Sequence, residues 1–228
     1  MFQKVVDFLF TKEVYSDVET YYTPTLAANI LLFVLIAVLL IAMAVFSGSQ
    51  RKLQVKQLTF AAMAVTLGVV TSFIKFAHLP FGGSITLFSM FFICLIGYMY
   101  GTKVGILTGI AYGFLQLIID PMIMHPVQML LDYPLAFGCL GITGVFSKAK
   151  NGLLKGYVLG VFGRYVCHVI SGIVFFSMYT PEGMNNIVYS IGYNATYILP
   201  EAIATVILLL VPAIQKGLLE VKRMAVQN

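Results

Sequence analysis

The sequence predicts an all-α integral membrane protein with seven transmembrane helices. Of its 228 residues, 60% are hydrophobic and 10% are charged, which leaves too little charge to cover the surface of a soluble domain. The apolar residues gather in runs close to the roughly 20 residues that a helix needs to cross a bilayer. No stretch alternates polar and apolar residues as a membrane barrel strand must, so we expect spanning helices.

Seven apolar segments can be marked, and the first and last differ from the others. The first carries no ionisable group over residues 30–46, so we expect a lipid-facing anchor ahead of a six-helix core that begins near Lys56. The last is long enough to bend, and Pro200 lies within it. The segments are 25–47, 57–77, 84–100, 104–120, 127–147, 155–179 and 187–215.

The basic residues indicate how these segments are oriented. Ten of the 14 Lys and Arg residues fall in connections on one side, with Glu220 as the single acid there, and six acids gather on the other side. The positive-inside rule therefore places the N-terminus outside and the C-terminus in the cytoplasm. The ten basic residues are Arg51, Lys52, Lys56, Lys103, Lys148, Lys150, Lys155, Lys216, Lys222 and Arg223.

This orientation divides the chain into five parts. The acidic residues near the N-terminus argue against a cleaved secretory signal, which would open with a basic region. The net charge of +5 is dispersed over short connections, so we expect the lipid bilayer as a partner and no nucleic acid. The parts are an extracellular segment at 1–24, an extra N-terminal transmembrane helix at 25–47, a basic cytoplasmic linker at 48–56, a membrane domain at 57–215 and a cytoplasmic tail at 216–228.

Four ionisable side chains lie inside the predicted membrane segments, where each needs a functional or structural reason. Asp132 is a candidate for ligand binding, because an intramembrane carboxylate is costly to keep. Arg164 has a simpler interpretation, in which it pairs with Asp132 or Glu201 to neutralise buried charge. His168 is either a functional group or an ordinary hydrogen-bonded histidine of the bundle.

An aromatic-walled pocket with a carboxylate is predicted in the outer half of the bundle. His168 shares one helix face with residues four positions before it and four and eight positions after it. Tyrosines cluster at the outer end of the seventh segment, where they also suit the membrane interface. Such a pocket suits a flat, cationic, hydrogen-bonding ligand. The outer residues are Asp132, Phe176, Tyr189 and Asn194, and Tyr133 and Tyr193 lie beside them.

The second segment carries small residues at helical spacing, namely Ala61, Ala64 and Gly68. Such a face lets two helices approach closely in lipid. The spacing alone leaves open whether it packs inside the bundle or docks another membrane protein.

No catalytic motif accompanies these residues. A GxxxxGK[ST] loop is absent, so ATP hydrolysis by this chain is not expected, and neither HExxH nor a Gly-rich dinucleotide turn occurs. The three cysteines lie in apolar runs without CxxC spacing. His78 and His125 lie in outer loops without metal-ligand spacing, so we expect no metal and no cofactor. An enzyme using His168 and Asp132 would lack a nucleophile.

Three blocks of sequence resemble the thiamine-specific substrate-binding (S) components of energy-coupling factor (ECF) transporters, over roughly residues 57–215. In order, they are LDYPLAF with GITGVF at 131–137 and 141–146, GRYVCHVISGIVFF at 163–176, and PEG with YSIGYN at 181–183 and 189–194. The resemblance implies a six-helix bundle in the bacterial plasma membrane that binds its vitamin near the outer surface. The helix at 25–47 is then an addition, which makes seven in total.

The resemblance also implies partners and residue roles. The S component captures thiamine and docks on a membrane-embedded coupling (T) subunit that two cytoplasmic ATPase subunits drive, so only the partners use ATP. Ala61, Ala64 and Gly68 resemble the docking surface. Asp132 matches the family's acidic ligand, His168 and Gly172 match a His and a Gly beside the bound rings, Phe176 falls where some members have a stacking Trp, and Tyr189 and Asn194 match a hydrogen-bonding Tyr and Asn.

One departure from the family and two rival functions remain. The chain has no Trp, so the second aromatic wall must come from elsewhere, with His78 or Phe81 as candidates. One rival is an S component for another vitamin or a thiamine precursor. The other is an independent proton-coupled secondary transporter using the four buried ionisable groups, although no inverted repeat with matching broken helices is visible.

Overall fold

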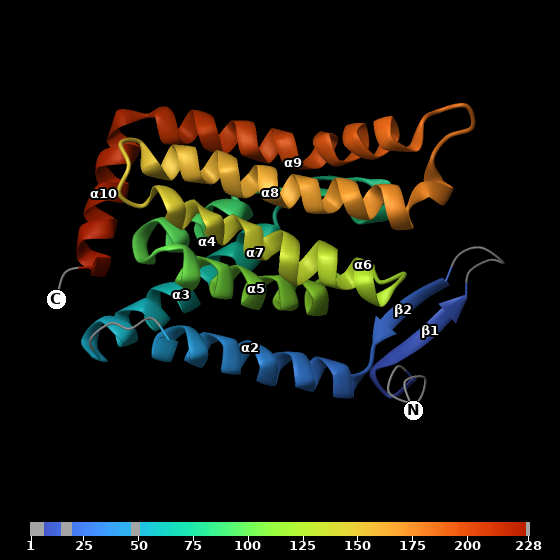
Figure 1. The fold of residues 1–228 in the computed structure, drawn as a ribbon, viewed down its shortest axis with the longest axis horizontal. Helices are drawn as coiled ribbons and strands as arrows, with labels where there is room; N and C mark the ends of the chain where they lie inside the picture. Colours follow the sequence, from blue (N-terminus) through green and yellow to red (C-terminus); the bar gives the residue numbers. More distant parts are fainter. Residues whose placement is uncertain (1–6, 15–19, 47–50, 227–228) are drawn as a thin grey trace.

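Long helices run side by side in the computed structural model, which describes residues 7–14, 20–46 and 51–226 (Figure 1). A β-hairpin lies at one end of the bundle, and the C-terminal helix α10 crosses the opposite end. The hairpin joins β1 (Phe10–Val14) to β2 (Thr20–Pro24) in antiparallel register. It leads into α2 (Leu26–Phe46), which lies against α5 and α3.

Helix α2 has the apolar surface expected of a lipid-facing anchor. Ile30, Phe33 and Val34 are each more than half exposed, whereas Ala28 and Ile36 are buried against the core. The next described element is α3 (Arg51–Ser72).

The remaining helices form the bundle that holds the cavity described below. They are α4 (Ser89–Tyr100), α5 (Thr102–Ile119), α6 (Pro126–Leu130), α7 (Ala136–Leu140), α8 (Gly152–Phe175), α9 (Asn186–Leu210) and α10 (Pro212–Val226). A π-helical turn, η2 (Leu131–Leu135), joins α6 to α7, and the 3-10 turns η3 (Gly141–Phe146) and η4 (Ser177–Tyr179) follow α7 and α8.

Five helical stretches in the described part of the chain are long and apolar enough to cross a membrane. They are Val55–Ser72, Thr102–Ile119, Pro126–Phe146, Gly152–Phe175 and Asn186–Leu210. Leu26–Val38 and Ser89–Tyr100 are apolar but shorter. The mostly helical membrane fold is therefore confirmed. In the described residues, two of the seven predicted spans are shorter than a helix that crosses a membrane, so the count of seven is not confirmed.

The loop between α3 and α4 corrects two predicted boundaries. The segment expected at 57–77 ends at Ser72, and the one expected from residue 84 begins at Ser89. The intervening residues form β3 (Lys75–His78) and β4 (Ser84–Thr86), which pair antiparallel around the turn η1 (Pro80–Gly82). An all-α description is thus wrong for this loop and for the N-terminal hairpin.

The last predicted segment, 187–215, is too long at its C-terminal end. Helix α9 stops at Leu210 because Val211 is extended, with φ −72° and ψ 120°. A residue that precedes proline is pushed out of the helical region by the proline ring, and Pro212 then opens α10. Most of the expected C-terminal tail is therefore helical.

The small-residue face of α3 points inward, which corrects its expected role as a docking surface. Ala61, Ala64 and Gly68 are buried in the core. Gly68 lies against the ring of Tyr112, whose hydroxyl donates to the Gly68 carbonyl at 3.1 Å. The small side chains make room for α4 and α5, so internal packing explains them.

Candidate ligand-binding site

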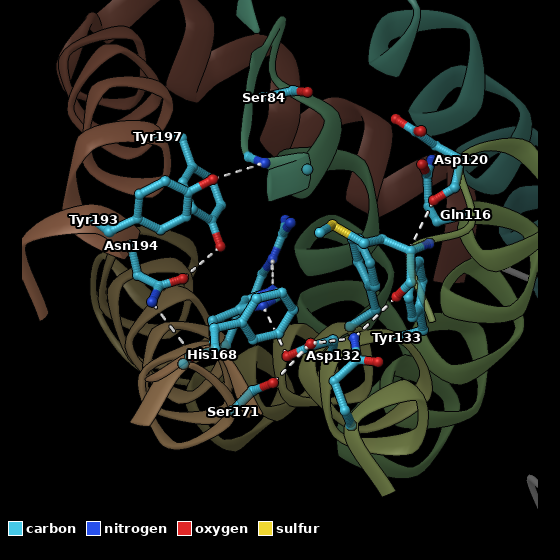
Figure 2. A pocket seen from close by; sticks show the side chains of 18 of the residues that line it. Ser84, Gln116, Asp120, Asp132, Tyr133, His168, Ser171, Tyr193, Asn194 and Tyr197 are labelled. Carbon is cyan, nitrogen blue, oxygen red and sulfur yellow. Dashed lines mark hydrogen bonds and ion pairs between the residues drawn. The ribbon is translucent and has the colours of Figure 1, made fainter. Parts of the chain in front are cut away.

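A cavity of about 160 Å³ lies where α5 ends, α6 and α9 begin and α8 ends. In Figure 2, side chains of α9 face those of α5 and η2 across an open centre. The β3–β4 loop contributes Gly82, Gly83, Ser84 and Thr86 to the wall. Every substrate-binding residue expected from the family resemblance lies in this lining, namely Asp132, His168, Gly172, Phe176, Tyr189 and Asn194.

Asp132 is the central polar group of the cavity. It sits in the π-helical turn, where Pro134 supplies no backbone N–H and the wider turn directs the carboxylate inward. Its Oδ2 atom accepts hydrogen bonds from Gln128 Nε2 and Ser171 Oγ, both at 2.7 Å. Its Oδ1 atom is buried and has no hydrogen-bond partner among the described residues. One carboxylate oxygen is therefore held by two hydrogen bonds, and the other is buried without one in the part of the chain described.

His168 lies against the second oxygen of Asp132. The distance from His168 Nδ1 to Asp132 Oδ1 is 3.2 Å, and Arg164 Nε donates to His168 Nε2 at 3.3 Å. The imidazole therefore lies between the Asp132 carboxylate and the Arg164 guanidinium, with one ring nitrogen toward each.

The expected pairing of Arg164 with an acid is not what the structure shows. Its guanidinium carbon lies 4.2 Å from the centroid of the Phe137 ring, and no ion pair joins Arg164 to Asp132 or Glu201 in the described residues. A guanidinium stacks readily on an aromatic face, which partly replaces its hydration.

Glu201 lies outside the cavity lining but holds a lining residue in place. Its Oε2 accepts from Thr86 Oγ1 at 2.6 Å, and its Oε1 accepts from the backbone N–H of Met90 at 3.0 Å. Met90 is in the first turn of α4, where an anion is favoured by the unsatisfied N–H groups. Glu201 therefore joins the loop to the helix start.

Aromatic rings from α8 and α9 form the apolar walls. Tyr193 lies between Tyr189 and Tyr197, with ring centroids 5.9 and 5.8 Å away. The rings of Phe176 and Tyr179, which follow the end of α8, are 6.1 Å apart. All five rings line the cavity.

Asn194 and Gly172 shape the cavity through contacts with protein. The Asn194 side chain donates to the Ser190 carbonyl at 2.8 Å and accepts from the Tyr197 hydroxyl at 2.6 Å. A Cβ at Gly172 would lie 2.1 Å from Ser190 Oγ, so only glycine lets α8 and α9 approach here. In this structure Asn194 holds Tyr197 in place.

The second aromatic wall was expected from His78 or Phe81 in the loop between α3 and α4, and the described residues do not show it there. His78 is exposed, lies outside the lining and contacts Ser84 Oγ at 3.1 Å through Nδ1. The side chain of Phe81 lies outside the described residues. Tyr193, a secondary candidate, ties the loop to α9, because its hydroxyl donates to the Pro80 carbonyl and accepts from Gly83 N. The other secondary candidate, Tyr133, accepts from Met122 N at 2.8 Å.

Several lining residues were missed by the sequence interpretation. Gln128 lies four positions before Asp132 on the same helical face, and that spacing was the available signal. Lys75 and Asp120 form an ion pair of 2.7 Å across the cavity lining, which no local pattern indicates. No group of three or more His, Cys, Asp or Glu side chains suited to a metal occurs in the part of the chain described.

Residues 58–220, well over half of the chain, match the model of the family described as thiamine transporter protein. The chain belongs to the thiamine transporter protein family. The resemblance seen in the three sequence blocks is thereby confirmed, including the position of the blocks within the matched range.

Individual relatives agree with this family. The Bacillus subtilis (strain 168) protein named thiamine transporter ThiT is 41% identical over 162 residues, covering 65% of this chain and 83% of that protein. The ThiT of Lacticaseibacillus paracasei (strain ATCC 334) is 33% identical over 116 residues, covering 43% of this chain and 58% of that protein. A solved structure of ThiT from Listeria monocytogenes has a TM-score of 0.57 at 24% identity, covering 67% and 92% of the two chains, which shows a shared fold.

Membership in the thiamine transporter protein family determines the class of function. Its relatives are named as transporters, which is a non-enzymatic role, and the apolar helices agree with a multi-pass membrane protein.

Proposed function

We propose that this protein is the high-affinity thiamine-binding S component of an ECF-type importer. The observation that carries the proposal is the buried Asp132 carboxylate inside an aromatic cavity of a thiamine transporter family member, where Oδ1 makes no hydrogen bond among the described residues and has His168 Nδ1 beside it at 3.2 Å. Thiamine combines a permanently cationic thiazolium ring with an aminopyrimidine that donates hydrogen bonds. It offers both a charge and a donor to that oxygen.

The contacts of the cavity support separate roles for the carboxylate and the aromatic rings. Asp132 Oδ2 accepts hydrogen bonds from Gln128 and Ser171, and Oδ1 lies beside His168, so the carboxylate keeps a fixed direction in the cavity wall. Phe176 and the tyrosines of α9 provide faces on which flat rings stack, and such faces also attract a cation. The protein binds the vitamin and carries out no chemistry on it.

The membrane arrangement completes the proposal. Seven helices span the bilayer, with α2 and α4 as the two that length alone does not establish, and the N-terminus lies outside. The cavity opens on the same end as the hairpin and is therefore extracellular. The basic connections on the other side lie in the cytoplasm.

Coupling requires a surface for the membrane-embedded subunit, which two cytoplasmic ATPases drive. With the Ala61 face buried, the exposed side of α3 takes this role. Ala62 and Thr66 are exposed there at a spacing of four, and the Thr66 hydroxyl is bonded to the Ala62 carbonyl at 2.9 Å. Small side chains whose polar groups are satisfied suit close helix contact in lipid.

The test is radiolabelled thiamine binding by the full chain, purified and reconstituted in liposomes. We expect saturable binding without accumulation. Asp132→Asn, which keeps the shape and removes the charge, should weaken binding about ten- to a hundredfold, as expected for hydrogen bonds to a charged group. Glu182→Gln, an exposed carboxylate outside the cavity, should bind as the wild type does.

Each rival predicts a different result in this experiment. Binding of radiolabelled riboflavin, biotin, folate or the pyrimidine precursor, with no binding of thiamine, would keep the class and replace the substrate. Accumulation by the chain alone that an uncoupler abolishes would indicate an independent proton-coupled transporter. Equal binding by wild type and Asp132→Asn would overturn the role of the carboxylate.

A further inference from the structure

The N-terminal hairpin lies outside the residues that match the family, yet it contacts the rim of the cavity. The hydroxyl oxygens of Tyr21 and Tyr179 are 2.6 Å apart, although the residues are separated by 158 positions. The backbone N–H of Tyr22 donates to the carbonyl of Ile123 at 2.8 Å. Figure 1 shows the hairpin at the end of the bundle where α6 begins.

These contacts reach two different connections beside the cavity. Tyr179 lines the cavity from the connection after α8, and Ile123 follows the lining residue Met122 in the connection before α6. The two connections also meet where the rings of His125 and Phe175 stack, with centroids 5.2 Å apart. The hairpin therefore bridges segments that must separate if this side of the rim opens.

The hairpin is itself held in place by α2. Thr25 N donates to the Leu9 carbonyl at 2.9 Å, and the Thr25 hydroxyl accepts from Ala28 N at 3.3 Å as a helix cap. Helix α2 in turn packs on α5, which contributes to the cavity wall. A bridge fixed at both ends loses little entropy when it makes its contact with the rim.

Two side-chain contacts connect the hairpin to the wall on which the ligand is expected to stack. Tyr21 holds the hydroxyl of Tyr179, and the Tyr179 ring lies 6.1 Å from that of Phe176. Both rings line the cavity, so the position of Tyr179 affects the wall on which the vitamin stacks.

We propose that the N-terminal hairpin is an accessory part of the binding site, in which Tyr21 is a positioning residue that holds Tyr179 at the rim and slows the release of bound thiamine. The inference rests on the proposed function. Tyr21 does not line the cavity and acts through Tyr179.

The test is the rate at which radiolabelled thiamine leaves the full-length protein after excess unlabelled thiamine is added. Removing one hydroxyl with Tyr21→Phe should speed release about two- to tenfold, the range expected for one hydrogen bond. Tyr179→Phe should have the same effect, and the double variant should release no faster than either single variant. Tyr22→Phe is the matched control, because its side chain points to the opposite face of the strand and its contact uses the backbone.

A melting curve of the ligand-free protein separates positioning from general destabilisation. We expect the melting temperatures of the four variants to agree with that of the wild type. Wild-type release from Tyr21→Phe, or single effects that multiply in the double variant, would overturn the inference while the proposed function stands. A wild-type protein that retains no thiamine would overturn the proposed function and this inference with it.

Discussion

Two buried carboxylates in this protein have different roles because their oxygens have different partners. Asp132 has one oxygen that makes no hydrogen bond in the described structure and lies 3.2 Å from His168 Nδ1, next to the cavity. Glu201 uses both oxygens within the protein, on Thr86 and on the first turn of α4. A buried carboxylate therefore lines the cavity in one place and holds a helix start in the other.

At the residue scale, Glu201→Gln should destabilise the ligand-free protein by about 1–3 kcal/mol, because a hydrogen-bonded buried anion is removed from a helix N-terminus. Thermal unfolding in detergent measures this change. Glu220→Gln is the matched control, since Glu220 is exposed and its pair with Arg223 contributes little. Equal losses in the two variants would contradict the capping role of Glu201.

The helices pack most closely where glycines face backbone. A Cβ at Gly141 in η3 would lie 2.1 Å from the backbone carbon of Gly105 in α5, and one at Gly109 would lie 2.3 Å from the Phe137 carbonyl. Helix α5 thus contacts the segment formed by α6, η2, α7 and η3 through backbone atoms on both sides. This contact holds the π-helical turn, and with it Asp132, against the cavity.

At the element scale, Gly141→Ala should lower stability by about 1–3 kcal/mol, because the added methyl forces the two backbones apart. The unfolding midpoint measures this change. Gly217→Ala in α10 is the control, since no atom lies within 4 Å of a Cβ there, and alanine should stabilise that helix by roughly 0.5–1 kcal/mol. A neutral Gly141→Ala would show that the helices separate without cost.

The whole molecule has one end that carries the hairpin and the cavity and one end that carries α10. At the α10 end, Lys222 donates to the Ser147 carbonyl at 2.5 Å and lies 3.7 Å from the centroid of the Tyr98 ring. The basic connections occur at this end, so the positive-inside rule predicts that it faces the cytoplasm. The orientation proposed above follows from this charge distribution.

At the scale of the whole molecule, Glu182→Cys should react with a membrane-impermeant maleimide in intact cells, and Lys150→Cys should react only after the cells are opened. Both positions are exposed, at opposite ends of α8. The unsubstituted protein is the control, because Cys94 and Cys167 are buried and Cys139 is half-buried. The reverse labelling pattern would contradict the orientation.

The sequence by itself determined the class of the protein, the main helices and six residues that line the cavity. Membrane helices can be predicted locally, because a bilayer requires each span to carry its own apolar run and its own backbone hydrogen bonds. The sequence also indicated Asp132, because an ionisable residue is rare inside such an apolar run. The family blocks then placed six residues that the structure brings into one cavity.

The tertiary structure alone decided which way each helix faces and which distant segments meet. Whether Ala61 packs inward depends on the rotation of α3 against its neighbours, and Arg164 faces Phe137 because α7 packs on α8. Tyr193 meets Pro80 across 113 residues, and Tyr21 meets Tyr179 across 158. Such contacts leave no periodic signal, because they depend on how whole elements pack rather than on residues near each other in the chain.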